Sequence, residues 1–371
     1  MIDDPRGFGP KKRALVAAFS DDLRQAVHGL AEDDFRAVLP ILVEHGLLQR
    51  FVSPVEQGGY RYTGDWKSVL GCLSKIGGID LSTARLLEGH LNVLQLVALY
   101  GSAAQQNFVL ETVQNGGMLG VWGADGKEPV RLDGVEGTSA WRIRGSKRYA
   151  SGAGILRAAL VPISQKDGPM QLLLLPVDDP SRVDLSSWHY RGMQRTASGT
   201  YSFENLTLGP EAFVGQPDCY RREPWFVGGI WRCAAAQLGA IEAIVRIIAR
   251  ELNDNGRAEH PLQRARIGRA IMQARTARLW IEDAAQRVET TMPDAHTDEI
   301  AQTVALSAYS RLVTEEAAMS VIDLAERALG LGSFETSHPV ERLTRDLAVY
   351  IRQANPDAVL LQHGRVLASG L

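Results

Sequence analysis

The sequence predicts an α+β protein in which a helical N-terminal domain, a middle β domain and a C-terminal helical bundle follow one another. Two observations predict this order. The apolar residues recur with a helical period up to about residue 115, alternate or run in short blocks over 118–215, and recur helically again from 224. A chain of 371 residues is also too long for one ordinary core. We place the domains at 1–117, 118–222 and 223–371.

The N-terminal domain is expected to be helical because its apolar residues lie on single helical faces. The segment "LPILVEHGLL" (39–48) has such a face, and residues 66–99 contain two more segments that each end at a glycine. The intervening "VSPVEQGGYRYTGD" (52–65) is rich in Gly and polar residues and contains Pro, so we interpret it as a loop.

The middle domain is expected to be a β-barrel or sandwich. The run "WRIR" (141–144) alternates apolar and charged residues, while "RAALVPIS" (157–164) and "QLLLLPVD" (171–178) are short apolar runs bounded by turn residues. Strand signals at this roughly even spacing are typical of a β domain.

The C-terminal domain is expected to be an antiparallel four-helix bundle. Apolar residues between 238 and 252 are spaced by three and four, and the same rule continues over 267–288 and 300–329. Polar segments at 253–256 and 290–298 separate these three long helices, and a shorter helix follows.

Composition excludes several classes of function. Apolar residues make up 45%, charged residues 22%, and the net charge of −3 gives no field that favours nucleic acid or anionic lipid. Cys72, Cys219 and Cys233 are far apart, which argues against a disulfide framework or a zinc site. The start has no signal pattern, and charged residues interrupt the most apolar window, 228–249. We therefore expect a cytoplasmic protein with no membrane span and no metal.

Five segments, in order, resemble the acyl-CoA dehydrogenase family of flavoproteins over nearly the whole chain. They are "GLLQRFVSPVEQGG" (46–59), "GVWGADG" (120–126), "IRGSKRYASGAGILRAALV" (143–161), "GMQRTASGTYSFENLTLGPEAFVG" (192–215) and "HPVERLTRD" (338–346). The family has N-terminal helices, a middle β domain and a C-terminal four-helix bundle, so the resemblance implies the same fold and a bound FAD.

The resemblance also implies which residues hold the FAD. Tyr149 and Ser151 stand at the family's positions beside the flavin ring, where an aromatic face covers the ring and a hydroxyl can bond near N5. Trp122, Ala124 and Asp125 stand at the family's flavin-contacting turn, where Ala124 replaces a Thr and leaves backbone N–H groups as donors.

Three further positions are implied for the phosphate and adenine half of FAD. Arg257 resembles an Arg that reaches the FAD phosphates of a neighbouring subunit in the family, a role that suits a bidentate donor. Gly330 and Gly332 in "ALGLGSF" (328–334) would let the backbone approach the adenine half, although they could equally end a helix.

The family's catalytic glutamate has no counterpart at either usual position. The common position aligns with Gln353 or Ala354, and the alternative one, directly before Arg232, holds Trp231. Asp357 is the nearest acid that could act as a shifted base, although Asp357 after Pro356 would also suit a helix start. The more distant acids Glu251 and Asp125 stay open as bases too.

Two functions therefore stay open. In the first, the chain dehydrogenates an acyl thioester, passes hydride to flavin N5 and delivers electrons to an electron-transfer flavoprotein. Trp231, with Trp188 and Trp225, would then restrict the acyl group to small, branched or aromatic ones. In the second, it is a monooxygenase, an oxidase or a catalytically silent FAD-binding member, with His363 the nearest histidine to Gln353. In either case we expect a homodimer or homotetramer.

Overall fold

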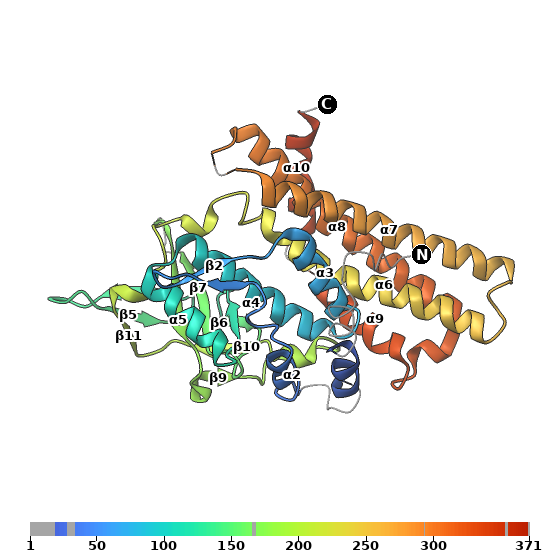
Figure 1. The fold of residues 1–371 in the computed structure, drawn as a ribbon, viewed down its shortest axis with the longest axis horizontal. Coiled ribbons are helices and arrows are strands. Elements are labelled where there is room, and N and C mark those ends of the chain that lie inside the picture. Colours follow the sequence, from blue (N-terminus) through green and yellow to red (C-terminus); the bar gives the residue numbers. More distant parts are fainter. Residues whose placement is uncertain (1–18, 28–33, 165–167, 293, 353–354, 370–371) are drawn as a thin grey trace.

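The chain folds in the predicted order of helices, β-sheets and helices. The structure, a computed structural model, describes residues 19–27, 34–164, 168–292, 294–352 and 355–369. Figure 1 shows the β domain at one end of the molecule and the long C-terminal helices at the other, with α3 and α4 between them. The predicted α+β fold class is confirmed, and no described helix combines the length and the apolar character that crossing a bilayer requires.

The N-terminal part is helical, as predicted, except for one small hairpin. Residues 19–27 are helical. The elements that follow are α2 (Leu39–Glu44), β1 (Val52–Pro54), β2 (Tyr60–Tyr62), α3 (Trp66–Gly77), α4 (Leu81–Tyr100) and α5 (Ala103–Gln114). The segment 52–65 was interpreted as a loop, which is wrong where β1 pairs antiparallel with β2. Strands of only three residues are too short to show an alternating pattern.

Three helices of this region begin at a side-chain cap. Asp65 caps α3 by accepting from the Ser68 N–H, and Asp80 caps α4 in the same way. Ser102 and Gln105 form a capping box at the start of α5.

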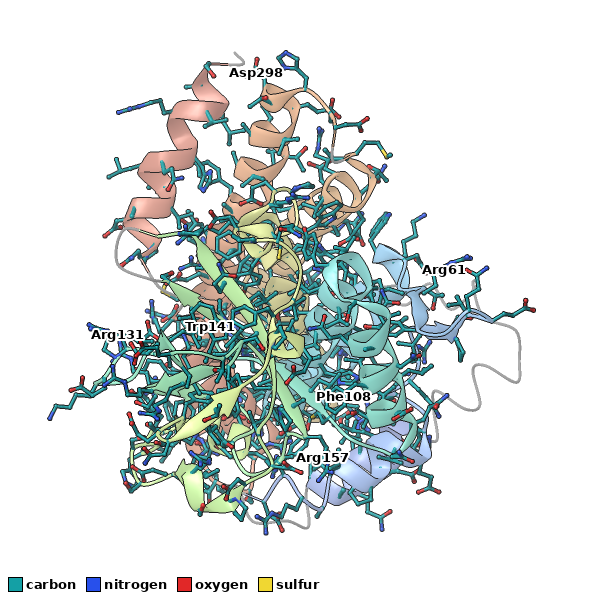
Figure 2. All side chains as sticks on the ribbon, turned by 90° about the vertical axis from the view of Figure 1, so that its left-hand side faces the viewer. Arg61, Phe108, Arg131, Trp141, Arg157 and Asp298 are labelled. Atoms are coloured by element: carbon teal, nitrogen blue, oxygen red, sulfur yellow. The ribbon has the colours of Figure 1, made fainter. Side chains whose placement is uncertain are left out.

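The middle domain consists of three three-stranded sheets. Their strand orders are β6-β10-β9, β11-β5-β4 and β3-β7-β8, and only the β3–β7 pair among them is parallel. The strands are β3 (Leu119–Val121), β4 (Arg131–Gly134), β5 (Trp141–Arg144), β6 (Ser146–Ala150), β7 (Ala158–Ser164), β8 (Met170–Pro176), β9 (Val183–Asp184), β10 (Gly199–Ser202) and β11 (Leu206–Leu208). In Figure 2, Arg131 and Trp141 mark the β4–β5 hairpin, and Asp298 marks the distant start of α8.

The C-terminal part is a bundle of long helices. Its elements are α6 (Trp231–Asp254), α7 (Pro261–Thr290), α8 (Thr297–Leu329), α9 (Pro339–Tyr350) and α10 (Pro356–Ala368). The helices α6, α7 and α8 pack on one another, α9 packs on α6 as the fourth, and α10 is an additional helix against α8. Helix α6 also packs closely on α3 at Gly239. A Cβ added at this glycine would overlap the Ser74 carbonyl oxygen, so the absence of a side chain permits the close contact.

Candidate functional site

A cavity of about 640 Å³ lies where the β domain meets α4 and the end of α9. Three of the residues that the resemblance assigns to the flavin line this cavity: Ala124, Tyr149 and Ser151. Ala124 lies in the turn after β3, and Tyr149 and Ser151 lie at the end of β6. The turn and β6 are side by side, because Asp125 of the turn forms a β-bridge with Lys147 of β6. The structure thus brings together the two segments that the resemblance assigned to the flavin ring.

Hydroxyl groups line one side of this cavity as a connected chain. The hydroxyl of Ser151 lies 2.8 Å from that of Ser198, which lies 2.8 Å from the Thr196 hydroxyl. Thr196 donates in turn to the Met193 carbonyl at 2.7 Å. Because the Thr196 proton is committed to Met193, Ser198 donates to Thr196 and Ser151 donates to Ser198, so the Ser151 hydroxyl at the end of the chain can accept a hydrogen bond from a ligand N–H.

Three aromatic side chains form another side of the cavity. The rings of Trp188 and Tyr190 lie 4.5 Å apart between centroids, and Tyr149 meets both edge-on at 6.4 and 6.3 Å. Tyr149 has a φ of +50°, a left-handed conformation that is strained for a bulky residue, and its side chain is 46% exposed. A strained, half-exposed aromatic ring at a cavity wall is typical of a ligand-binding position.

The charges around the cavity are positive. Arg85, Arg148 and Arg352 line it, and no carboxylate of a described residue does. Arg352 pairs with Glu315 at 2.7 Å, whereas Arg148 stacks 5.0 Å over the Tyr149 ring and has no acidic partner among the described residues. The cavity therefore favours a ligand that carries negative charge.

The other two residues of the predicted turn shape the cavity from behind. Trp122 is fully buried, and its indole N–H donates to the Ser151 carbonyl at 3.0 Å. Asp125 accepts from Lys147 at 2.7 Å, and the same buried ammonium donates to the Gly123 and Pro162 carbonyls. Burial lowers the pKa of Lys147, and Asp125 opposes this shift. These bonds fix the turn on β6 and so position Ser151.

The three residues implied for the adenine half lie together, but they do not line this cavity. Arg257 donates to the Ala328 carbonyl at 3.1 Å, at the end of α8 where Gly330 follows as the C-cap with a φ of +71°. A Cβ at Gly330 or Gly332 would meet nothing within 4 Å. The backbone there is thus open to a neighbouring molecule.

Comparisons with known proteins agree with this architecture. Residues 229–351 match the family model "Acyl-CoA dehydrogenase, C-terminal domain". The structure superposes on butyryl-CoA dehydrogenase from Megasphaera elsdenii with a TM-score of 0.81, at 16% identity over 98% of both chains. A putative acyl-CoA dehydrogenase of Bacillus subtilis, YdbM, is 25% identical over 72% of this chain and 73% of its own. Residues 229–351 thus match the acyl-CoA dehydrogenase family, and the whole chain has the acyl-CoA dehydrogenase fold.

Other similar proteins are monooxygenases. Dibenzothiophene monooxygenase from Rhodococcus erythropolis is 27% identical over 225 residues, which are 58% of this chain and 51% of the relative. The chain thus spans about half the length of these curated relatives. TdsC from Paenibacillus sp. A11-2, crystallised with FMN and indole, superposes with a TM-score of 0.83 at 18% identity over 98% of both chains.

The structure does not bring the expected shifted base to the cavity. Asp357 is exposed on the first turn of α10 and does not line the cavity. Gln353 and Ala354 lie outside the described residues. Of the alternative acids, Asp125 is paired with Lys147 and Glu251 with His338 at 2.8 Å. His363 is buried on α10, where burial lowers its pKa.

Trp231 does not line this cavity. It also does not line a smaller cavity, of about 170 Å³, which lies between α4, β3, the segment 220–230 and the start of α6. It is fully buried, and its indole N–H donates to Glu289 at 3.3 Å. Its neighbour Arg232 is also buried, donates to Glu289 at 2.6 Å and lines the smaller cavity. Of the other predicted tryptophans, Trp188 lines the large cavity and Trp225 the smaller one.

Sequence reasoning missed the polar face of α4. Arg85 lines the large cavity, Glu88 lines the smaller one, and their side chains pair at 2.6 Å. The signal was present in the sequence, since Arg85, Glu88, Asn92 and Gln95 interrupt an apolar helix at spacings of three, four and three. The described residues contain no cluster of three His, Cys, Asp or Glu that could hold a metal ion.

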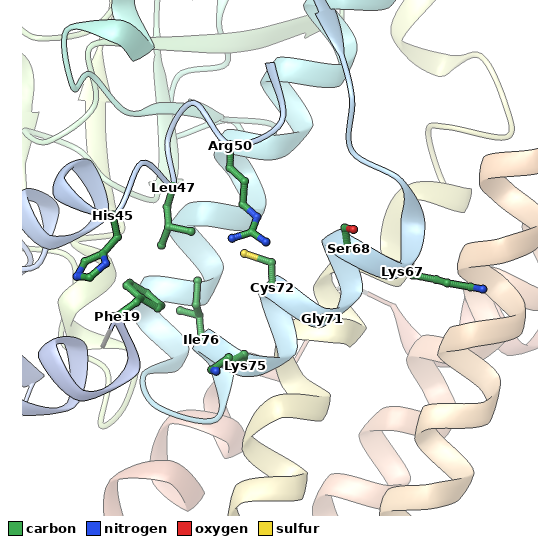
Figure 3. A pocket seen from close by; sticks show the side chains of 10 residues that line it. All are labelled: Phe19, His45, Leu47, Arg50, Lys67, Ser68, Gly71, Cys72, Lys75 and Ile76. Atoms are coloured by element: carbon green, nitrogen blue, oxygen red, sulfur yellow. The ribbon is translucent and has the colours of Figure 1, made fainter. Parts of the chain in front are cut away.

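A third cavity, of about 170 Å³, lies in the N-terminal domain and contains none of the predicted site residues. In Figure 3 the Arg50 guanidinium lies beside the Cys72 thiol, while Lys67 and Lys75 point away from it. Burial raises the pKa of Cys72 to about 11, against the opposing effect of Arg50. The thiol is protonated at neutral pH, so it lacks the reactivity of a thiolate nucleophile.

Proposed function

We propose that the chain is a flavin-dependent monooxygenase, which transfers one oxygen atom of O₂ to a small organic molecule. The observation that carries this proposal is the absence of a carboxylate among the described residues that line the large cavity. A dehydrogenase of this family needs a base to remove the α-proton of its substrate. A monooxygenase needs none, and the dibenzothiophene monooxygenases and TdsC are among the similar proteins.

The large cavity fits a flavin. Its volume of about 640 Å³ lies within the usual range for cofactor pockets. The aromatic side chains of Tyr149, Trp188 and Tyr190 suit a planar ring, and the Ser151 hydroxyl suits a ring nitrogen. We propose that Arg148, which lacks an acidic partner among the described residues, binds the flavin phosphate.

The flavin form that we propose is FMN, in place of the FAD expected from the sequence. TdsC was crystallised with FMN. Binding of FMN at least tenfold tighter than FAD would support the choice, and the reverse order would contradict it.

The chemistry divides between the cofactor and the protein. A reduced flavin supplies the two electrons with which one oxygen atom of O₂ enters the product while the other leaves as water. The flavin is reduced elsewhere, by a separate reductase. The protein orients the ring through Ser151 and the aromatic side chains, and the buried junction of β domain, α4 and α9 keeps bulk water away.

A second candidate function is dehydrogenation of an acyl thioester, with electrons passed to an electron-transfer flavoprotein. The observation that favours it is Glu88, a buried carboxylate directly behind the large cavity. Its bonds to Arg85 at 2.6 Å and to Asn92 at 2.5 Å would compete with its use as a base.

One experiment separates the two functions. The purified chain is mixed anaerobically with reduced FMN, and O₂ is then admitted together with indole, dibenzothiophene or methanesulfinate. We expect a product that is 16 mass units heavier, with 18O incorporated from 18O₂, and a Ser151→Ala variant with weaker FMN binding. Bleaching of the oxidised flavin by butyryl-CoA without O₂ would instead establish the dehydrogenase and reject the proposal.

We also propose that the chain forms a homodimer or homotetramer through its C-terminal helices. Large apolar side chains are exposed there: Ile271, Met272 and Leu279 on α7, and Leu360 and Leu361 on α10. Light scattering after gel filtration tests this, and a monomer at micromolar concentration would contradict it.

A further inference from the structure

The smaller cavity behind the large one has a volume of about 170 Å³. It lies between α4, β3, the segment 220–230 and the start of α6. The Arg85–Glu88 ion pair separates the two cavities, because Arg85 faces one and Glu88 the other. A molecule in the smaller cavity would therefore lie next to whatever occupies the larger one.

Aromatic residues form one wall of the smaller cavity. The rings of Tyr220 and Phe226 meet edge-on with centroids 4.9 Å apart, and Trp225 stands beside them in the lining. Engineered cavities of about 150 Å³ bind one benzene molecule. A cavity of about 170 Å³ with aromatic walls therefore suits one ring or a compact pair of fused rings.

Hydrogen-bond acceptors dominate the opposite wall, on α4. Glu88 accepts one bond at each oxygen, from Arg85 and Asn92, and a carboxylate has further lone pairs free. The amide oxygen of Asn92 has no donor among the described residues. The donor groups of Arg232 are turned instead to Gln95 and Glu289, each at 2.6 Å.

We propose that the smaller cavity binds the substrate, and that the substrate is a one- or two-ring aromatic compound carrying an N–H or O–H group that donates to Glu88 or Asn92. This inference rests on the proposed function. Glu88 and Asn92 are specificity-determining residues in it. A site built to bond an N–H or O–H group rejects analogues that lack the group, because its buried acceptors are then left unpaired.

The test measures binding by the full chain, without flavin and with saturating FMN, by isothermal titration calorimetry. The probes are indole, 1-methylindole and benzothiophene, which share a shape but differ in the N–H group. We expect indole to bind about tenfold tighter or more than the other two. Equal affinity for indole and 1-methylindole, or no measurable binding of any probe, would overturn the proposal.

Variants assign the preference to α4. Glu88→Gln and Asn92→Ala are each expected to reduce the preference for indole severalfold and to leave 1-methylindole binding unchanged. Glu111→Gln, an exposed acid on α5, is the matched control and should change nothing. If one of the two α4 variants fails to fold, the other still tests the proposal. An unchanged preference for indole over 1-methylindole in both variants overturns the proposal.

The outcome is distinct from a failure of the proposed function. Binding is measured without turnover, so a retained indole preference with no oxygen transfer would reject the monooxygenase alone. Oxidation of indole and 1-methylindole with equal KM would reject the assigned substrate class alone.

Discussion

The buried ion pair between Asp80 and Arg195 joins the β domain to the start of α4, and its loss should destabilise the whole chain. The Asp80 carboxylate is 0% exposed and accepts from Arg195, itself 3% exposed, at 2.6 Å. Its other oxygen caps α4 by accepting from the Thr83 N–H at 2.8 Å. The substitution Asp80→Asn removes the charge and keeps the cap, because Asn caps helices as well as Asp does.

The expected loss is about 3–5 kcal/mol in the free energy of unfolding, since Arg195 stays buried without the carboxylate that neutralises it. Arg342 lies 3.6 Å from the same carboxylate and loses a weaker attraction. The assay is urea denaturation followed by circular dichroism and tryptophan fluorescence, whose transitions must coincide for the free energy to be defined.

The control is Asp65→Asn at the exposed cap of α3. It makes the same chemical change at a helix start without a buried partner, so we expect less than about 0.5 kcal/mol. If Asp80→Asn cost no more than this control, the argument that the pair holds the domains together would be refuted.

Asp346, two glycines and Ser151 give further expected outcomes. Burial, and then the Asp80 carboxylate, raises the pKa of Asp346 from 3.8 to about 6, so the folded state retains a proton that the unfolded state releases. Stability should therefore fall by up to about 3 kcal/mol from pH 4 to 7 relative to Asp346→Asn, in urea titrations, and equal profiles would contradict this. Gly239→Ala should lower the free energy of unfolding by about 1–3 kcal/mol, because the added methyl group clashes with α3. Gly268→Ala should raise the free energy of unfolding by up to about 1 kcal/mol, because its methyl group would meet nothing within 4 Å. Thermal unfolding compares the two variants, and equal effects would refute the clash. Ser151→Ala should weaken FMN binding roughly fivefold to tenfold in fluorescence titrations, and an unchanged Kd would remove the hydroxyl from the site.

Most of the fold followed from the period of apolar residues, because long helices need a continuous apolar stripe. The helices α6, α7 and α8 appear where that stripe was found, and α3 and α4 end at the predicted glycines. The β1–β2 hairpin was not predicted, because its strands are too short to show a period. Helix α10 begins at Pro356, where Pro356 and Asp357 offered a helix start in the sequence, and His363 is its buried residue.

The candidate site was predictable in part. Ala124, Tyr149 and Ser151 were placed by motifs next to strands, and strand pairing then brings them together. Glu88 was not predicted, because it stands at neither of the two positions at which the family carries its base. The four polar residues of α4, spaced by three, four and three, would have shown that one face of this apolar helix serves polar chemistry.

Two of the five segments that carried the resemblance contribute to the joint between domains, and this limits what they can say about the reaction. Arg195 of the segment 192–215 pairs with Asp80, and Asp346 of the segment 338–346 accepts from the Met193 N–H at 2.7 Å. These contacts fasten the β domain to α4 and α9, and the cavity opens between those same elements. A monooxygenase and a dehydrogenase on this fold would both need such a joint, so these two motifs do not distinguish the two reactions. The reaction is determined by the few side chains around the cavity, where this chain has arginines, hydroxyls and the Arg85–Glu88 pair.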